Sequence, residues 1–176
     1  MIILPRLLGD LLAQVDERRG AELGLDFADH AVDFRAEPMT NPTRVVSEEY
    51  MAAARQALRL GRADDRLLRA HEAFVQEGWR SPGDSEAVNL LDSAVRLACQ
   101  DMLIEAGVYG RPGRVPLTPQ DIAKSAQSVV GRRYSERAAE GEDVQEVNRR
   151  ARWEEARWQV QRVIATEPVP GGGTGR

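Results

Sequence analysis

The sequence predicts an all-α protein, an irregular bundle of six or seven helices. Apolar residues recur every three or four positions over long segments, which is the spacing of one face of a helix. Leu, Val and Ala, together with Arg and Glu, dominate the composition and favour helices over strands. No alternating run of β-branched residues of useful length occurs. Only 5% of the 176 residues are aromatic, so the core must be mainly aliphatic.

The first predicted helix has an apolar face that begins at Leu4 and continues through Leu12 to Val15. Pro5 suits the first turn of a helix, where its missing N–H is not needed. Gly20 is the predicted end. The pattern over residues 21–46 is weaker: it favours a short helix from Ala21 to Phe34 without excluding irregular chain, before a loop containing Pro38 and Pro42.

Three further helices are predicted in the middle of the chain. Their boundaries come from hydroxyl or acidic residues suited to a first turn and from the glycines that follow each apolar stripe. The predicted ranges are Ser47 to Leu60, ending at Gly61; Asp64 to Glu77; and Asp84 or Ser85 to Ala106.

Residues 107–117 are rich in Gly and Pro and form the clearest internal boundary. Thr118 followed by Pro119 predicts a helix start, because a hydroxyl cap precedes proline in the first turn. That helix runs to about Ala139, and a last one runs from Gly141 and Glu142 to about Thr166. Residues 167–176 have too few side chains to pack, so we expect a disordered tail.

Charge divides the chain at the same boundary. Residues 1–110 carry 19 acidic and 12 basic side chains, whereas residues 111–176 carry 9 acidic and 12 basic ones. We therefore interpret residues 1–106 as an acidic helical body and residues 118–166 as two basic-leaning helices packed on it.

Several function classes lack support. Cys99 is the single cysteine, which excludes an intramolecular disulfide and a multi-cysteine metal site. Two histidines leave little from which to assemble a catalytic triad. No secretory signal or membrane-spanning segment is apparent, and we expect a cytoplasmic protein without a cofactor.

One acidic constellation suits a metal site. Asp26, Asp29, His30 and Asp33 are three or four residues apart, so a helix would align several of them on one face. Metal sites in helical bundles need a second ligand-bearing helix, and the sequence offers only one other histidine, His71. A solvated acidic face is the alternative interpretation.

A basic constellation lies in the last two predicted helices. Arginine with interleaved Tyr134, Trp153 and Trp158 suits contacts with phosphates and bases. Carboxylates such as Glu154 and Glu155 offset much of this charge, so a salt-bridged, solvated surface is the alternative. The candidate nucleic-acid-binding residues are Arg132, Arg133, Arg137, Arg149, Arg150, Arg152 and Arg157.

Two features suit a protein partner. The first helix has more apolar residues than a surface helix needs, so Leu4, Leu8 and Leu11 either dock into a partner or pack inside the bundle. Trp153 and Trp158 are five residues apart and point about 140° from each other on a helix. One therefore packs inside, and the other is a candidate interface anchor.

The favoured hypothesis is a non-enzymatic protein–protein interaction module, an adaptor or small subunit of a larger bacterial or phage-type assembly that contacts another protein or itself. A nucleic-acid-associated factor is the alternative, and a metal-dependent helical enzyme is the second alternative.

Overall fold

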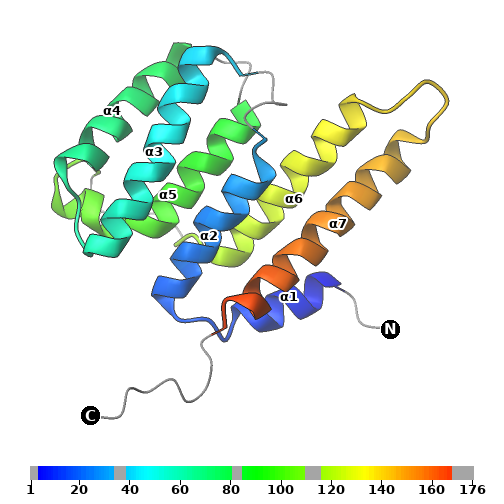
Figure 1. Cartoon of the computed structure of the whole chain (residues 1–176), viewed down its shortest axis with the longest axis horizontal. Helices are drawn as coiled ribbons and strands as arrows, with labels where there is room; N and C mark the ends of the chain where they lie inside the picture. Colours follow the sequence, from blue (N-terminus) through cyan, green and yellow to red (C-terminus); the bar gives the residue numbers. More distant parts are fainter. Residues whose placement is uncertain (1–3, 34–38, 81–84, 110–115, 168–176) are drawn as a thin grey trace.

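The computed structural model describes residues 4–33, 39–80, 85–109 and 116–167, which contain seven α-helices and no strand (Figure 1). The all-α prediction is confirmed. The helices are α1 (Leu4–Leu12), α2 (Glu17–Ala31), α3 (Asn41–Leu60), α4 (Asp65–Arg80), α5 (Ser85–Glu105), α6 (Pro119–Glu136) and α7 (Val144–Ala165).

Local chemistry explains two boundaries that the sequence predicted correctly. The Thr118 hydroxyl accepts from the backbone N–H of Asp121 at 3.2 Å, and the Asp121 carboxylate accepts from the backbone N–H of Thr118 at 3.0 Å. This reciprocal capping box fixes the start of α6. At the end of α3, Gly61 has a φ of 68°, a left-handed conformation that glycine adopts without strain.

Two predicted boundaries are wrong because a stronger cap lies elsewhere. The first helix ends at Leu12 instead of near Gly20, since Asp16 accepts from the backbone N–H of Arg19 and begins α2. Ser47 does not begin α3: Thr40 caps that helix, and Ser47 lies fully buried inside it. The predicted second helix is real but spans Glu17–Ala31.

The last two helices are separated further than predicted. Helix α6 ends at Glu136, three residues before the expected Ala139. Helix α7 begins at Val144, where Asp143 accepts from the backbone N–H groups of Gln145 and Glu146. The carboxylate satisfies N–H groups that have no partner within the first turn.

The helices form two groups that share one core. Helices α3, α4 and α5 pack together, α6 and α7 form an antiparallel pair, α2 contacts α5 and α6, and α1 packs on α7 (Figure 1). A continuous cluster of buried side chains joins the groups, and it includes Leu8, Leu25, Phe27, Tyr50, Leu91, Ile122 and Val163. The last two helices are thus part of the same core as the acidic segment.

Part of the chain lies outside the described residues, including most of the Gly/Pro-rich connection (110–115) and nearly all of the predicted tail (168–176). Within the described ranges, no helix is long and apolar enough to cross a bilayer.

Candidate functional site

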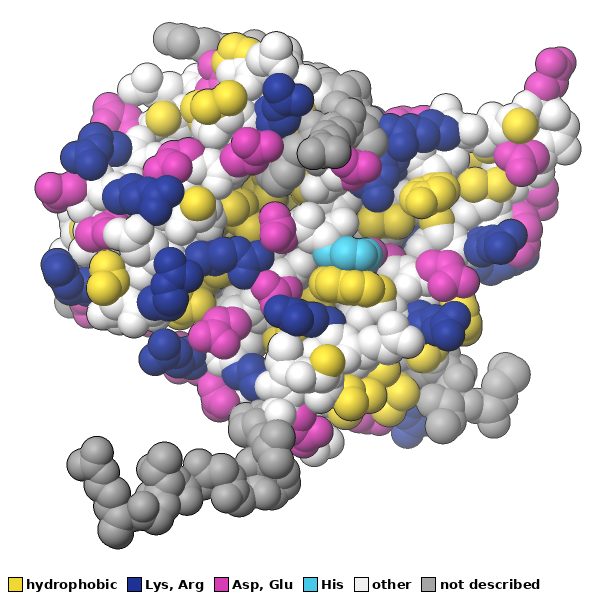
Figure 2. All heavy atoms as spheres, viewed as in Figure 1, with side chains coloured by type: hydrophobic (Ala, Val, Ile, Leu, Met, Phe, Trp, Pro, Cys, Tyr) yellow, Lys and Arg dark blue, Asp and Glu magenta, His cyan; other side chains and the backbone are white. Residues whose placement is uncertain are grey.

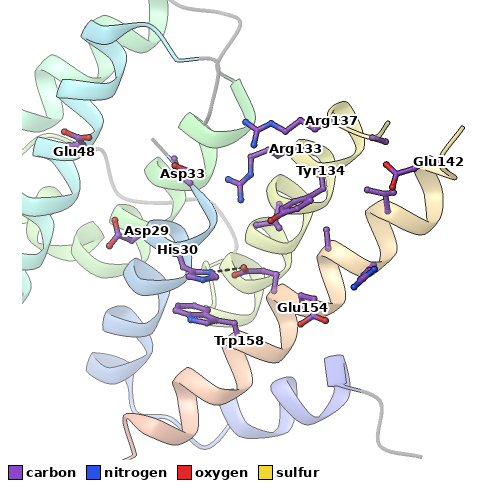
Figure 3. A pocket seen from close by; sticks show the side chains of 17 residues that line it. Asp29, His30, Asp33, Glu48, Arg133, Tyr134, Arg137, Glu142, Glu154 and Trp158 are labelled. Carbon is purple, nitrogen blue, oxygen red and sulfur yellow. Dashed lines mark hydrogen bonds and ion pairs between the residues drawn. The ribbon is translucent and has the colours of Figure 1, made fainter. Parts of the chain in front are cut away.

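A cleft of about 1200 Å³ opens between α2, α6 and α7 (Figure 3). Side chains of α6 lie at its centre, and those of α2 and α7 lie on opposite sides of them. The lining consists of Asp29, His30, Val32, Asp33, Glu48, Val130, Arg133, Tyr134, Arg137, Ala138, Glu142, Val147, Arg150, Ala151, Glu154, Glu155 and Trp158. We call this the α2/α6/α7 cleft.

The cleft exists because α2 ends before its neighbours do. Helix α2 terminates at Ala31, where Val32 turns into an extended conformation. Apolar side chains continue at intervals of four along and just beyond α6, at Val130, Tyr134 and Ala138. Val130 is buried in the core and Ala138 is half-buried, but Tyr134 is 52% exposed and has no covering helix among the described residues.

The closed end of the cleft is held by a buried polar chain. His30 Nδ1 donates to Glu155 Oε2 at 2.8 Å, and Gln159 Nε2 donates to Glu155 Oε1 at 3.0 Å. Gln127 Nε2 in turn donates to Gln159 Oε1 at 2.8 Å. The side chain of Glu155 is only 1% exposed, so these bonds offset the desolvation of its carboxyl group.

His30 joins this chain to the open cleft. Its imidazole stacks on the indole of Trp158 with the ring centroids 3.6 Å apart and the planes 5° from parallel. The His30 side chain is nevertheless 41% exposed, and Figure 2 shows histidine (cyan) on this face among interspersed cations and carboxylates. Carboxylate and indole together fix the imidazole at the junction of α2 and α7.

The rim carries both signs of charge. Arg133, Arg137 and Arg150 supply the cations, and Arg133 Nη1 donates to the backbone carbonyl of Ala31 at 2.6 Å. A cation at this position complements the partial negative charge of the α2 C-terminus. Carboxylates flank these arginines on both sides, with Asp29 from α2 and Asp33 just past its end, and Glu142 and Glu154 toward α7 (Figure 3).

The side chains predicted as metal ligands form other interactions. Arg55 and Arg162 both donate to the Asp26 carboxylate, at 2.7 and 2.6 Å, and Arg55 also bonds to Asp29 at 3.2 Å. His30 points to Glu155, and Asp33 lines the cleft. In the described part of the chain, no group of three or more His, Cys, Asp or Glu side chains is arranged to hold a metal ion.

The candidate nucleic-acid-binding arginines are not gathered on one surface. Arg133, Arg137 and Arg150 line the cleft, whereas the other four do not. Three of those four form ion pairs: Arg132 with Glu86 and Glu136, Arg149 with Glu146, and Arg157 with Glu154. The remaining one, Arg152, runs beside Gly131 of α6.

The partner-binding candidates divide between core and surface. Leu8 is 2% exposed and belongs to the protein's own core, while Leu4 and Leu11 pack partly buried against that core. Trp153 is 48% exposed, with the Arg157 guanidinium 5.9 Å from its ring centroid. Trp158 is partly buried and lines the cleft, so the two tryptophans differ as the spacing predicted.

Sequence reasoning missed Glu155 as a site residue. It was grouped with exposed carboxylates, but it is buried and bonded to a histidine 125 positions earlier. Its neighbours Ala151, Ala156 and Gln159 are also buried, so a helical-wheel reading of α7 places Glu155 on the inward face. The helical spacing of these buried residues along α7 was the sequence signal that could have identified Glu155.

A second polar cluster lies among α3, α4 and α5. Tyr50 Oη and His71 Nδ1 are 2.8 Å apart, and the rings of His71 and Tyr109 meet edge to face. Burial lowers the pKa of His71 and raises the pKa of Asp92. Burial also raises the pKa of the Cys99 thiol to about 12, so this cysteine is a buried core residue and not a reactive one.

No known protein family, no curated protein and no solved structure matches this chain.

Proposed function

We propose that the protein is a non-enzymatic protein–protein interaction module, an adaptor or small subunit of a larger assembly, which receives a segment of a partner protein in the α2/α6/α7 cleft. The observation that carries this proposal is the exposed ring of Tyr134, which lies with the half-buried Val147 and Trp158 in a cleft whose rim is charged. Such a surface matches the helix-in-groove mode of recognition, in which apolar anchors enter a groove and polar groups at its rim set orientation.

The size of the cleft favours a peptide segment over a small molecule. Pockets for small ligands enclose roughly 300 to 1,000 Å³, and this cleft of about 1200 Å³ is larger and open. Its accessible apolar groups, Tyr134, Val147 and Trp158, are spread over α6 and α7 instead of lining one enclosed chamber.

Charge argues against the nucleic-acid alternative. Phosphate backbones are bound through clusters of cations with few carboxylates between them. Six carboxyl side chains line this cleft beside only three arginines. The engagement of Asp26 and Asp29 by arginine likewise gives the metal-dependent enzyme no support.

Blocking the cleft tests the proposal. Val147 lines the cleft, and Val75 is an exposed valine of α4 outside it, so Val147→Arg and Val75→Arg make a matched pair. Each full-length chain is used to capture partners from the native cell at moderate salt, after thermal unfolding has confirmed that the variants fold.

We expect at least one protein to be retained by the wild type and by Val75→Arg and to be lost with Val147→Arg. Equal capture by all three chains would contradict a role for the cleft. If Val147→Arg does not fold, Tyr134→Ser, which removes an exposed ring from the same cleft, serves as the blocking variant.

A further inference from the structure

The imidazole of His30 presents one nitrogen to the α2/α6/α7 cleft, while its other nitrogen is bonded to a buried carboxylate. Nδ1 donates to Glu155 at 2.8 Å, and Trp158 stacks on one face of the ring. Nε2 lies on the opposite edge of a side chain that is 41% exposed, and it has no hydrogen-bond partner among the described residues. The stacked indole does not block this nitrogen, because its lone pair lies in the plane of the ring.

The buried polar chain determines which nitrogen of His30 carries the proton. The backbone carbonyl of Ala123 can only accept, and it accepts from Gln159 Nε2 at 3.2 Å. The Gln159 amide is thereby oriented, so its nitrogen also donates to Glu155 at 3.0 Å and its oxygen accepts from Gln127. Donors therefore approach the Glu155 carboxylate from both sides, and it accepts the Nδ1 proton of His30. A neutral His30 ring then has an unprotonated Nε2, the form that acts as a nucleophile.

We propose that His30 Nε2 is a phosphoryl-acceptor site, at which the protein carries a phosphoryl group taken from a donor of the phosphoramidate class. The Nε2 lone pair attacks phosphorus, and a new P–N bond forms as the P–N bond of the donor breaks. The amine of the donor leaves with the electron pair of that bond. The ring becomes positively charged, and the Glu155 carboxylate stabilises this charge through the Nδ1–H hydrogen bond. This site goes beyond the proposed function, since the reaction needs no docked protein.

Arginine side chains of the cleft supply cations for a phosphoryl group. Arg133 extends from α6 to the end of α2, where it donates to the backbone carbonyl of Ala31, the residue after His30 (Figure 3). Arg150 of α7 lines the same cleft. Guanidinium groups suit phosphate oxygens, because they offer several N–H donors in a fixed plane. A phosphoryl group on Nε2 therefore lies in a cleft that has cations on both α6 and α7.

The carboxylates nearest to His30 in the cleft are engaged by other groups. Asp29 is bonded to Arg55 at 3.2 Å, Glu154 pairs with Arg157 at 3.9 Å, and Asp33 also has a partner. A single phosphoryl group needs fewer cations than a nucleic-acid backbone, whose phosphates continue along the whole strand. The cleft can therefore hold one phosphoryl group although its charge argues against nucleic acid.

Potassium phosphoramidate is the probe that tests this site on the full-length protein. The protein is incubated with it at about pH 8, where an ordinary imidazole is neutral, and the gain of phosphoryl groups is followed by intact mass spectrometry. Fragmentation locates the modified residue, and phosphorus NMR distinguishes attachment at Nε2 from attachment at Nδ1. A synthetic peptide of residues 22–33, which contains His30 but not Glu155, gives the rate of an unassisted histidine.

We expect one phosphoryl group on His30, attached at Nε2, and a rate about 10-fold or more above that of the peptide. His30→Gln should abolish this modification, whereas His71→Gln should not change it, because His71 is only 8% exposed. Glu155→Gln should slow the reaction about 10-fold or more. It should also yield some of the Nδ1 isomer, since an amide can face Nδ1 with either its oxygen or its nitrogen. Thermal unfolding checks that each variant folds.

Two results would overturn the proposal. A rate equal to that of the peptide would show that the folded chain does not activate His30. Modification of another residue, or attachment at Nδ1, would show that Nε2 is not the acceptor. Both results come from the wild-type protein, so they hold even where a variant fails to fold. Failure of the proposed function is seen separately, as partner capture from cells that Val147→Arg does not alter.

Discussion

The two histidines lie in regions that differ in how completely neighbouring helices enclose them. His71, among α3, α4 and α5, is 8% exposed and bonded to the buried Tyr50 hydroxyl. His30, where α2 meets α7, is bonded to a buried carboxyl group, yet its side chain is 41% exposed at the edge of a large cleft. Both side chains are positioned by hydrogen bonds and aromatic contacts. Helices α3, α4 and α5 surround His71, whereas α2 ends one residue after His30 and leaves that side chain partly exposed.

This difference separates a structural polar cluster from a candidate binding surface. The cluster around His71 stabilises the packing of three helices and is closed to a large ligand. The cluster around His30 fixes the closed end of a cleft in which the Tyr134 ring is exposed. Four predictions test this contrast, from the largest expected effect to the smallest.

The enclosed region is expected to be far more sensitive to truncation than the cleft. Leu91 is fully buried, whereas Val147 is only partly buried. Leu91→Ala should lower the free energy of unfolding by about 2–5 kcal/mol, because it leaves a cavity in a packed core. Val147→Ala should lower it by less than about 1 kcal/mol. Urea denaturation measures both, and similar losses would show that the cleft wall is packed like the core.

The His30–Glu155 pair is expected to contribute to folding although it borders the cleft. His30→Ala removes one of the two hydrogen bonds to the buried Glu155 carboxyl group among the described residues, and it should lower the free energy of unfolding by about 1–3 kcal/mol. Glu155→Gln retains volume and hydrogen-bonding capacity and should be milder. A double-mutant cycle by urea denaturation measures the coupling of the pair; additive losses would mean that the two side chains do not stabilise each other.

Removing one oxygen inside the enclosed cluster is expected to have a smaller effect. Tyr50→Phe keeps the ring but leaves His71 Nδ1 without its hydroxyl partner. The free energy of unfolding should fall by about 1–2 kcal/mol, while capture of a cleft partner from the native cell stays unchanged. Loss of partner capture by a folded Tyr50→Phe protein would show that the two regions are coupled.

The smallest effect is a pH dependence that arises from burial of His71. Burial lowers the pKa of His71 below its ordinary value of 6.5, so near that value the unfolded chain binds more protons than the folded one. The contribution of His71 to stability is therefore present above pH 6.5 and is lost as pH falls from there through the folded-state pKa.

We expect His71→Gln to flatten the dependence of the unfolding free energy on pH below about pH 6.5, since the titrating group is removed. His30 is present in both proteins and cancels in the comparison. An unchanged slope would show that His71 is not desolvated.

Much of the fold could be predicted from the sequence because the relevant forces are local. Thr118 and Pro119 determine where α6 begins, and Gly61 determines where α3 ends, each through contacts within one helical turn. The spacing of apolar residues predicted most of the buried helix faces. The predicted boundaries at Gly20 and Ser47 are wrong because the helices begin at other capping residues. The Asp16 carboxylate caps α2 before Gly20, and the Thr40 hydroxyl caps α3 before Ser47.

The candidate site could be predicted only in part, because it depends on contacts between distant segments. Trp158 and the cleft arginines were identified as candidates from α7 and α6, and His30 from α2, but no local pattern brings them together. Glu155 was misassigned because the partner that stabilises its burial lies in α2. The position where α2 ends relative to α6 creates the cleft, and that relation is set by tertiary packing.

If the α2/α6/α7 cleft is the docking surface, hydrogen–deuterium exchange of the full-length protein with and without a partner captured from the native cell shows this most directly. Binding should slow amide exchange in the second half of α6 and the first half of α7 while leaving α4 unchanged, because helices covered by a ligand open less often. Protection confined to α1 or α4, or no change at a saturating concentration of the partner, would contradict docking in the cleft.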